Sequence, residues 1–413
     1  SDIFADAEDL CLYMPINNEV DVPVIAEEAR RQGKRLWLPR VDGETMDFFR
    51  YDEDTVLVTG SYDIMEPDSD IAFVGTPRGI ENKIVPAAGY RLYHVDIRGL
   101  KRSFSLENLR TAALMVKSHH EARKLLKLFK PDLVFGTGGY VCWPVVRAAS
   151  EMGIPTALHE SNASPGAAVK ILESHVDRIY VNFESTLGRL HHPEKALRVG
   201  NPLRSQFGEI SREEALRTLG YEGKYRRMIL SCGGSLGAEK INCEVLRFMR
   251  DYVSKHPEIK HIHASGAIER DAAKELFDSY GLGEYPNLEL CEYIYDMPLK
   301  MAAADLVINR AGAITLSELA FQGKPCVLIP SPNVTDNHQY KNARELEAAG
   351  AALLLQESEL EGDVFTEAVS ELVESSERLA SMSEAIRRFA VPDSADRIYA
   401  DIRALLDERS SGK

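Results

Sequence analysis

The chain has 413 residues, of which 44% are hydrophobic and 27% are charged, and its formal net charge is −15. This length allows two or three domains with full cores, and the composition is typical of a globular protein. The acidic balance argues against general nucleic-acid binding, which depends on neutralising phosphates.

No apolar run approaches the roughly 18 residues that span a bilayer, and no signal peptide is visible. Six cysteines are scattered along the chain without a C-x-x-C pair. We therefore expect neither a disulfide framework nor a zinc site, and the pattern fits a reducing cytoplasm.

The first seventy residues predict a strand, a helix and a second strand, over 10–14, 22–32 and 36–41. Beyond them, strand-like apolar runs alternate with amphipathic stretches, which is typical of α/β architecture with parallel sheets. The predicted strands are 132–135, 156–159, 178–181, 228–232, 259–264, 288–291, 306–309 and 325–330. The predicted helices include 106–127, 144–151 and 239–255, and the chain after residue 359 is mostly helical.

Two glycine-rich loops follow strands, GTGGY at 136–140 and GGSLGA at 233–238. Glycine lets the backbone approach a ligand closely, and a helix N-terminus behind the loop favours a diphosphate. A plain tight turn between strand and helix is the alternative. A join over about 199–225 separates the two loops, so we expect two Rossmann-like lobes that face a cleft.

Three polar segments also follow strands. The first, HESNASPG, places His159, Glu160 and Asn162 at a strand end, or is simply a polar turn. In the second, NRAGAITLSE, backbone N–H groups could bind a phosphate and Glu318 could accept sugar hydroxyls. Alternatively, Thr315 caps the helix and Glu318 completes a capping box. The third, DNHQYKNA at 336–343, could hold a sugar or base edge, or begin a surface helix.

From about residue 71 to 357 the chain resembles the bacterial N-acetylglucosaminyltransferases that make lipid II, the MurG type. The resemblance rests on the runs FVGTPRGIE, DIRGLKR, GTGGYV, IPTALHESNASPG, GNPLR, GGSLGA, YIYDM, ADLVINRAGAITLSEL, GKPCVLIPSP and HQYKNA, in family order. It implies a two-lobed GT-B fold and an inverting transfer of GlcNAc from UDP-GlcNAc to the C4 hydroxyl of the MurNAc of lipid I. It also implies that the reaction needs no metal and no cofactor.

The resemblance implies a role for each matching residue. Ser235 faces the diphosphate, Arg204 and Asn162 line the donor site, and Ile294 holds the uracil through its backbone. Gln339 meets the GlcNAc, and Glu318 binds the ribose hydroxyls. The segment that surrounds the phosphates and ribose is Ala313, Ile314, Thr315, Leu316, Ser317 and Glu318. Ser161 and Leu236 stand where many family members have glutamine. His159 and Glu160 are the candidates for the general base.

The acceptor is a membrane lipid, so the resemblance implies a peripheral protein on the cytoplasmic face of the bacterial cell membrane. An apolar patch ringed by basic residues would dock on the inner leaflet. Its candidates are Leu100, Lys101, Arg102, Phe104, Leu109, Arg110, Leu114, Met115 and Lys117. An ordinary amphipathic helix that buries its apolar face is the alternative.

Residues 1–70 lack the GGTGGH loop with which the family opens, whose histidine is a leading candidate for general base. They resemble instead the N-terminal part of 5-formyltetrahydrofolate cyclo-ligase, through LYMPINNEVD, GKRLWLPRV, MDFFRY and YDIMEP. That resemblance places Glu19 by a folate, but the ATP-binding segment of that family is absent.

We therefore expect three regions. They are a cyclo-ligase-like fragment over 1–70, an acceptor and membrane lobe over 71–199, and a UDP-GlcNAc-binding lobe over 200–413. Three hypotheses follow: a working lipid II-forming transferase, a fusion that binds UDP-GlcNAc but is catalytically impaired, and, remotely, a folate-related cyclo-ligase.

Overall fold

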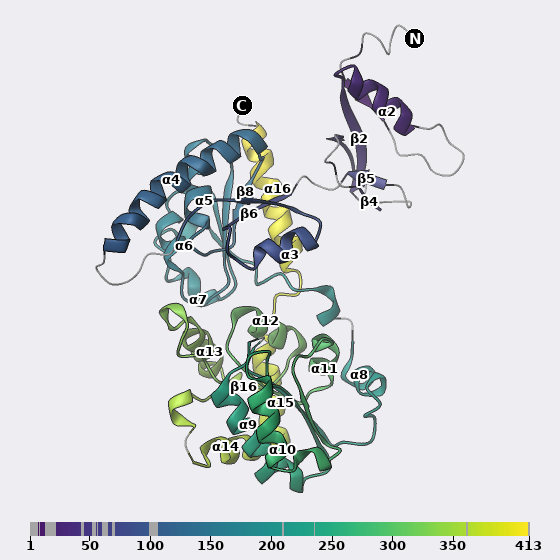
Figure 1. The fold of residues 1–413 in the computed structure, drawn as a ribbon, viewed down its shortest axis with the longest axis vertical. Coiled ribbons are helices and arrows are strands. Elements are labelled where there is room, and N and C mark those ends of the chain that lie inside the picture. Colours follow the sequence, from purple (N-terminus) through teal and green to yellow (C-terminus); the bar gives the residue numbers. More distant parts are fainter. Residues whose placement is uncertain are drawn as a thin grey trace. The chain divides into compact units, whose positions relative to one another are not determined.

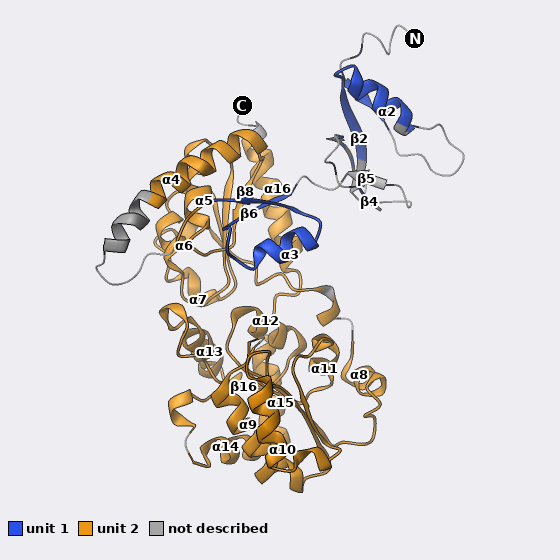
Figure 2. Ribbon diagram, in the orientation of Figure 1, with its two compact units in different colours: residues 1–95 blue, residues 96–413 orange. Residues whose placement is uncertain are grey.

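The structure is a computed structural model of the chain. It describes residues 7, 9–12, 22–42, 45–51, 55, 57–59, 65–67, 71–98, 106–208, 210–234, 236–360 and 362–411. The chain divides into two compact units, residues 1–95 and residues 96–413 (Figure 2). The first unit therefore extends past the expected boundary at residue 70, and the three expected regions stay predictions.

The described residues of unit 1 form three small sheets. Its elements are β1 Asp9–Cys11, α2 Val22–Arg31, β2 Arg35–Asp42, β3 Thr45–Arg50, β4 Leu57–Thr59, β5 Met65–Pro67, β6 Ala72–Gly75, α3 Glu81–Ala87 and β7 Arg91–His94 (Figure 1). The predicted strand–helix–strand pattern is confirmed, and β1 pairs with β2 in parallel. The sheets of this unit are not all parallel as in the predicted lobes, because β2–β3 and β4–β5 are antiparallel. The β6–β7 pair is parallel.

Unit 2 begins with a lobe built on a four-stranded parallel sheet of order β11-β10-β9-β8. Its strands are β8 Val134–Gly136, β9 Thr156–Glu160, β10 Arg178–Val181 and β11 Ala196–Arg198. Its helices are α4 Leu106–Phe129, α5 Cys142–Glu151, α6 Ala167–Leu172 and α7 Glu184–Leu187, with a 3-10 turn η2 at Pro193–Lys195. Every residue of β9 is buried, including the polar side chains of Thr156, His159 and Glu160.

The second lobe is built on a six-stranded parallel sheet of order β14-β13-β12-β15-β16-β17. Its strands are β12 Arg227–Cys232, β13 Ile259–Ala264, β14 Leu288–Cys291, β15 Leu306–Asn309, β16 Cys326–Leu328 and β17 Ala352–Leu354. Counted from β12, this is the doubly wound order 3-2-1-4-5-6, whose direction reverses between β12 and β15. Two apolar clusters cover the sheet, one containing Met228 and Leu230 and the other Ile229.

Helices connect these strands. They are α8 Arg212–Thr218, α9 Glu239–Asp251, α10 Arg270–Ser279, α11 Met297–Ala303, α12 Ala313–Gln322, α13 His338–Ala348, α14 Val364–Glu374 and α15 Ser376–Arg387. Short 3-10 turns lie between them: η3 Ser205–Phe207, η4 Val253–Lys255, η5 Leu282–Glu284, η6 Thr335–Asn337 and η7 Glu357–Glu359. The strands predicted over 178–181, 259–264, 288–291 and 306–309 are confirmed at the same bounds.

Helix α16, Ser394–Ser411, returns to the four-stranded sheet (Figure 1). Ile398 packs in one buried cluster with Ala157, Tyr180 and Val199. The carboxylate of Asp401 accepts hydrogen bonds from the Tyr180 hydroxyl at 2.8 Å and from the Arg178 guanidinium at 3.1 Å. Helix α16 is therefore part of the first lobe's core, although it follows the second lobe in the sequence.

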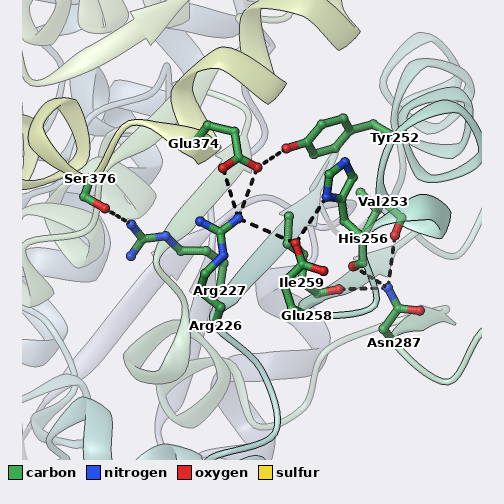
Figure 3. Close-up of polar contacts among 10 residues, drawn as sticks. All are labelled: Arg226, Arg227, Tyr252, Val253, His256, Glu258, Ile259, Asn287, Glu374 and Ser376. Carbon is green, nitrogen blue, oxygen red and sulfur yellow. Dashed lines mark hydrogen bonds and ion pairs between the residues drawn. The ribbon is translucent and has the colours of Figure 1, made fainter.

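A polar cluster ties the start of β12 to α14 and to the turn before β13 (Figure 3). Arg226 donates to the Glu374 carboxylate at 3.0 Å, and Tyr252 donates to the same group. These hydrogen bonds keep the pKa of Glu374 below its ordinary value. The Asn287 amide donates to three backbone carbonyls nearby. The cluster stabilises the N-terminal ends of the strands, opposite the glycine loop.

Candidate functional site

The candidate site lies where the order of the six-stranded sheet reverses. The glycine loop at 233–238 follows β12, and the segment 310–312 follows the neighbouring strand β15. Open α/β sheets bind ligands outside the carboxyl ends of their strands at such a point. The two segments that the sequence singled out are therefore adjacent in the fold.

The glycine loop is held in a conformation that favours glycine. Gly234 has φ +96° and Gly237 has φ +95°, and the Gly237 N–H donates to the Gly234 carbonyl at 3.1 Å. A Cβ on Gly237 would lie 2.4 Å from the Ser265 carbonyl oxygen, so only glycine fits there. The loop leads into α9, and no side chain caps that helix at Ala238. Ser235 lies outside the described residues.

The N-terminus of α12 also lacks a side-chain cap. Its N-cap residue is Gly312, and the first N–H bonded back to it is that of Leu316, at 3.0 Å. Among the described residues, the N–H groups of Ala313, Ile314 and Thr315 have no acceptor. The alternative in which Thr315 caps this helix and Glu318 closes a capping box is therefore wrong, since Thr315 lies inside the first turn. A free helix N-terminus of this kind can receive an anion.

Glu318 lies one turn further along α12 and is partly buried. Burial raises the pKa of its carboxyl to about 7, and the charge of Arg204 acts in the opposite direction. No hydrogen bond from a described residue reaches the Glu318 carboxylate, so it is free to accept donors from a ligand. Arg204 is exposed, and its guanidinium lies 5.8 Å from the centre of the Phe207 ring.

His159 and Glu160 end strand β9, and both are buried, with 6% and 5% of their surface exposed. His159 Nε2 donates to the Gly200 carbonyl at 2.8 Å, and burial lowers the pKa of its ring. Glu160 Oε1 accepts from the Asn162 N–H at 2.9 Å, and Oε2 accepts from the Gly166 N–H at 2.7 Å. The Glu160 carboxylate thus shapes the loop that carries Asn162.

Two sets of amide contacts join this loop region to the second lobe, and sequence reasoning missed both. Asn342 on α13 donates to Asn162 Oδ1 at 3.0 Å and to the Ala311 carbonyl at 3.3 Å. Asn201 donates to Ser317 Oγ at 2.9 Å, and Ser317 Oγ lies 3.3 Å from Asn182 Oδ1. The predicted residues Asn162 and Ser317 therefore each accept a hydrogen bond from a buried amide, and the sequence predicted neither contact.

The remaining predicted residues take part in internal contacts. Ile294 is 2% exposed and packs in the core cluster beneath the sheet ends. Gln339 Oε1 accepts from the Ser331 N–H at 2.8 Å. Ser161 Oγ lies 3.5 Å from His159 Nδ1, and Leu236 is 63% exposed. A small hollow is lined by Asn182, Phe183, Leu316, Ser317, Leu346 and Phe389.

Two family profiles match the chain, the glycosyltransferase family 28 N-terminal domain over residues 63–181 and the C-terminal domain over 228–398. A curated relative from Acetivibrio thermocellus is 40% identical over 347 residues, which are 84% of this chain and 93% of the relative. It is named UDP-N-acetylglucosamine--N-acetylmuramyl-(pentapeptide) pyrophosphoryl-undecaprenol N-acetylglucosamine transferase. The chain belongs to this transferase family.

A second member of the transferase family, from Lactococcus lactis, is 39% identical over 81% of this chain and 90% of the relative. The crystal structure of Acinetobacter baumannii MurG has the same fold, with a TM-score of 0.63, 24% identity and coverage of 96% of this chain and 99% of that one. A UDP-GlcNAc 2-epimerase from Neisseria meningitidis bound to UDP-GlcNAc matches with a TM-score of 0.55, 15% identity and coverage of 82% and 92%. These likenesses confirm the predicted two-lobed GT-B fold.

The transferase family accounts for the chain from residue 63, slightly before the predicted junction near residue 71. The cyclo-ligase resemblance of residues 1–70 stays a prediction, and Glu19 lies outside the described residues.

Of the membrane candidates, Leu100, Lys101, Arg102 and Phe104 lie outside the described residues, as do the side chains of Leu109 and Arg110. Leu114 and Met115 are partly buried on α4, and Lys117 Nζ lies 3.6 Å from Asp96 and 3.5 Å from Glu121. Within the described part of the chain, no helix is both long and apolar enough to cross a bilayer.

Proposed function

We propose that this chain transfers GlcNAc from UDP-GlcNAc to the C4 hydroxyl of the MurNAc of lipid I, which forms lipid II for peptidoglycan synthesis. Its membership of a family whose members are named for this transfer supports the proposal. The observation that carries it is the pair of uncapped helix N-termini at the reversal of the six-stranded sheet, α9 behind the glycine loop and α12 behind Gly312. Both suit a diphosphate.

In this proposal the donor lies on the second lobe. The loop with Ser235 and the first turn of α12 from Ala313 to Ser317 receive the diphosphate, and Arg204 adds positive charge. Glu318 accepts the ribose hydroxyls, because its carboxylate has no other described donor. Ile294 holds the uracil through its backbone, Gln339 meets the GlcNAc, and Asn162 lines the site from the first lobe.

The chemistry requires stabilisation of the departing UDP. Backbone N–H groups, helix dipoles and one guanidinium are preorganised donors that act on charge developing in the transition state. The acceptor hydroxyl must lose a proton, and a base must reach it within about 3 Å or through one water. His159 and Glu160 are the proposed candidates, and the burial of His159 supports a neutral ring that could accept a proton.

The test combines binding and turnover. Calorimetry with UDP-GlcNAc and a turnover assay with a lipid I analogue are carried out on the full chain and on the variants Glu318→Gln, His159→Gln and Glu160→Gln. We expect Glu318→Gln to weaken UDP-GlcNAc binding. The variant that removes the base should bind the donor normally and lose turnover. Absence of UDP-GlcNAc binding in the unchanged chain would refute the proposal.

A second candidate is a donor-binding protein without turnover. It is favoured by unit 1, where β1 pairs with β2 in a separate three-stranded sheet and, among the described residues, β6 pairs with β7 alone. No GGTGGH loop stands in residues 1–70. Donor binding without any turnover of the lipid I analogue would select this candidate over the transferase.

We also propose that the chain works as a peripheral protein on the cytoplasmic face of the cell membrane, through the predicted patch that includes Leu114, Met115 and Lys117. Sedimentation with vesicles that contain anionic lipid tests this. Loss of binding on replacing Lys101 and Arg102 with glutamate would support the patch, and unchanged binding would exclude it.

A further inference from the structure

A series of hydrogen-bonded, buried polar side chains runs from β13 and β12 to α9 beneath the glycine loop. Ser231 on β12 and His261 and His263 on β13 are all 0% exposed, and Asn242 on α9 is 3% exposed. Ser231 Oγ lies 2.8 Å from His261 Nε2 and 2.9 Å from His263 Nδ1. His263 Nε2 lies 3.0 Å from Asn242 Oδ1, and Asn242 Nδ2 donates to the Ser265 carbonyl at 3.0 Å.

The direction of these hydrogen bonds follows from their last member. Because the Asn242 amide donates to a carbonyl, its oxygen faces His263 and must accept a hydrogen from Nε2. Burial lowers the pKa of His263 to about 4, so its ring is neutral and its Nδ1 accepts from the Ser231 hydroxyl. In the other tautomer of His263, Nδ1 would carry the hydrogen and donate to the Ser231 carbonyl 3.2 Å away. Nε2 would then face the Asn242 oxygen with no hydrogen between them, so this tautomer is disfavoured.

Ser231 Oγ then accepts from His261 Nε2, which leaves His261 Nδ1 without a hydrogen. That atom is buried and has no partner among the described residues, so this assignment leaves no buried N–H of His261 unpaired. Hydrogen-bond donation therefore runs in one direction: His261 donates to Ser231, Ser231 donates to His263, and His263 donates to Asn242.

This series of hydrogen bonds ends at the backbone that supports the glycine loop. Gly237 lies against the Ser265 carbonyl, and a Cβ on Gly266 would lie 2.1 Å from the Gly237 nitrogen. The Ile268 N–H donates to the Leu236 carbonyl at 3.1 Å. Since Asn242 lies near the start of α9 and holds the Ser265 carbonyl, it fixes the loop and the helix N-terminus relative to β13.

We propose that His263 and Asn242 are positioning residues that set the geometry of the diphosphate-binding loop at 233–238. Neither touches the donor; His263 fixes the orientation of the Asn242 amide, and Asn242 fixes the backbone on which Gly237 rests. The inference depends on the proposed UDP-GlcNAc site and adds the residues that hold its phosphate contacts in place.

The fold offers a matched control in His261. It is as buried as His263 and begins the same series of hydrogen bonds, but it does not contact Asn242 or the Ser265 backbone that supports the loop. The experiment measures the affinities of the full chain for UDP and for uridine, which lacks the phosphates. We expect His263→Asn and Asn242→Ala to weaken UDP binding about tenfold and to leave uridine binding unchanged. His261→Asn should leave both affinities unchanged, and His263→Gln, which keeps a donor near the Nε2 position, should restore most of the UDP affinity.

The outcomes are separable. If His263→Asn and His261→Asn give the same ratio of UDP to uridine affinity, the positioning role is refuted. If His263→Asn does not fold, Asn242→Ala decides alone, and unchanged UDP affinity in that variant refutes the proposal. Failure of the unchanged chain to bind UDP would refute the proposed function itself, which is a different result.

Discussion

The side chain of Asn342 donates a hydrogen bond of 3.0 Å to the side-chain oxygen of Asn162. Its own oxygen accepts from the Ala163 N–H at 2.9 Å, and Asn342 is 0% exposed. Asn162 and Ala163 follow β9 in the first lobe, whereas Asn342 lies on α13 in the second. One buried amide therefore connects the two lobes next to the candidate site.

Replacing Asn342 with alanine should destabilise the chain strongly. The change leaves the Ala163 N–H, the Asn162 oxygen and the Ala311 carbonyl without this partner. Leaving buried polar groups unpaired is expected to lower the free energy of unfolding by about 3 kcal/mol. Urea unfolding measures this, with the exposed Asn333→Ala as control. Equal stabilities of the two variants would contradict the prediction.

Donor affinity should depend on pH through Glu318. Burial raises the pKa of this carboxyl to about 7, and the ionised form accepts hydroxyl donors better. Affinity should therefore fall as pH falls through 7, by about tenfold between pH 8 and pH 6. Calorimetry with UDP-GlcNAc is the suitable measurement, because its diphosphate has no ionisation near neutral pH. Glu318→Gln should bind more weakly and with a flat pH profile; a flat profile in the unchanged chain would exclude this role.

Two glycines of the same loop should respond differently to alanine. Gly234 and Gly237 have nearly equal φ angles, +96° and +95°. A Cβ at position 234 meets nothing within 4 Å, whereas at 237 it would lie 2.4 Å from the Ser265 oxygen. Gly237→Ala should therefore cost at least about tenfold more UDP affinity than Gly234→Ala, which bears the backbone strain alone. Equal losses in the two variants would mean that the contact with Ser265 is unimportant.

The buried histidines should make the fold sensitive to acid. Burial lowers the pKa of His263 from 6.5 to about 4 and lowers that of His261 well below 6.5, beside Lys260. The unfolded chain then takes up protons below about pH 6.5 that the folded chain takes up only near pH 4. The contribution of the two neutral histidines to the free energy of unfolding is complete above about pH 6.5. It is lost as the pH falls, by up to about 1.4 kcal/mol per pH unit for each histidine. Urea unfolding at pH 7.5 and pH 5 measures the loss, and His263→Gln should reduce it. A loss that is as large in this variant would assign it to other groups.

The architecture of unit 2 was predictable from the sequence because its strands are buried on both faces. Strand β15 is apolar up to Asn309 and its ends coincide with the ends of burial, whereas β13 is buried throughout although it includes Lys260, His261 and His263. The antiparallel β2–β3 and β4–β5 pairs of unit 1 were not predicted, since pairing direction depends on the connection between strands and leaves little trace in short segments.

The candidate site was predictable where glycine or a helix start marks it, as at Gly237 and Gly312. Asn201 and Asn342 lie in runs that the sequence marked, but the contacts of these amides and of Asn182 were not predicted, because they join residues far apart in the chain. Thr315 was given a possible cap role from residue type alone, whereas the position of the first bonded N–H, that of Leu316, places the cap at Gly312.

The return of α16 to the first lobe has a consequence for how the protein is made. Tyr180 lies in the first lobe's sheet, but the residues that cover it, Ile398 and Asp401, are synthesised only after the whole second lobe. The second lobe has its own core and can fold while the ribosome is still translating. The first lobe is synthesised earlier but completes its core only when α16 has left the ribosome.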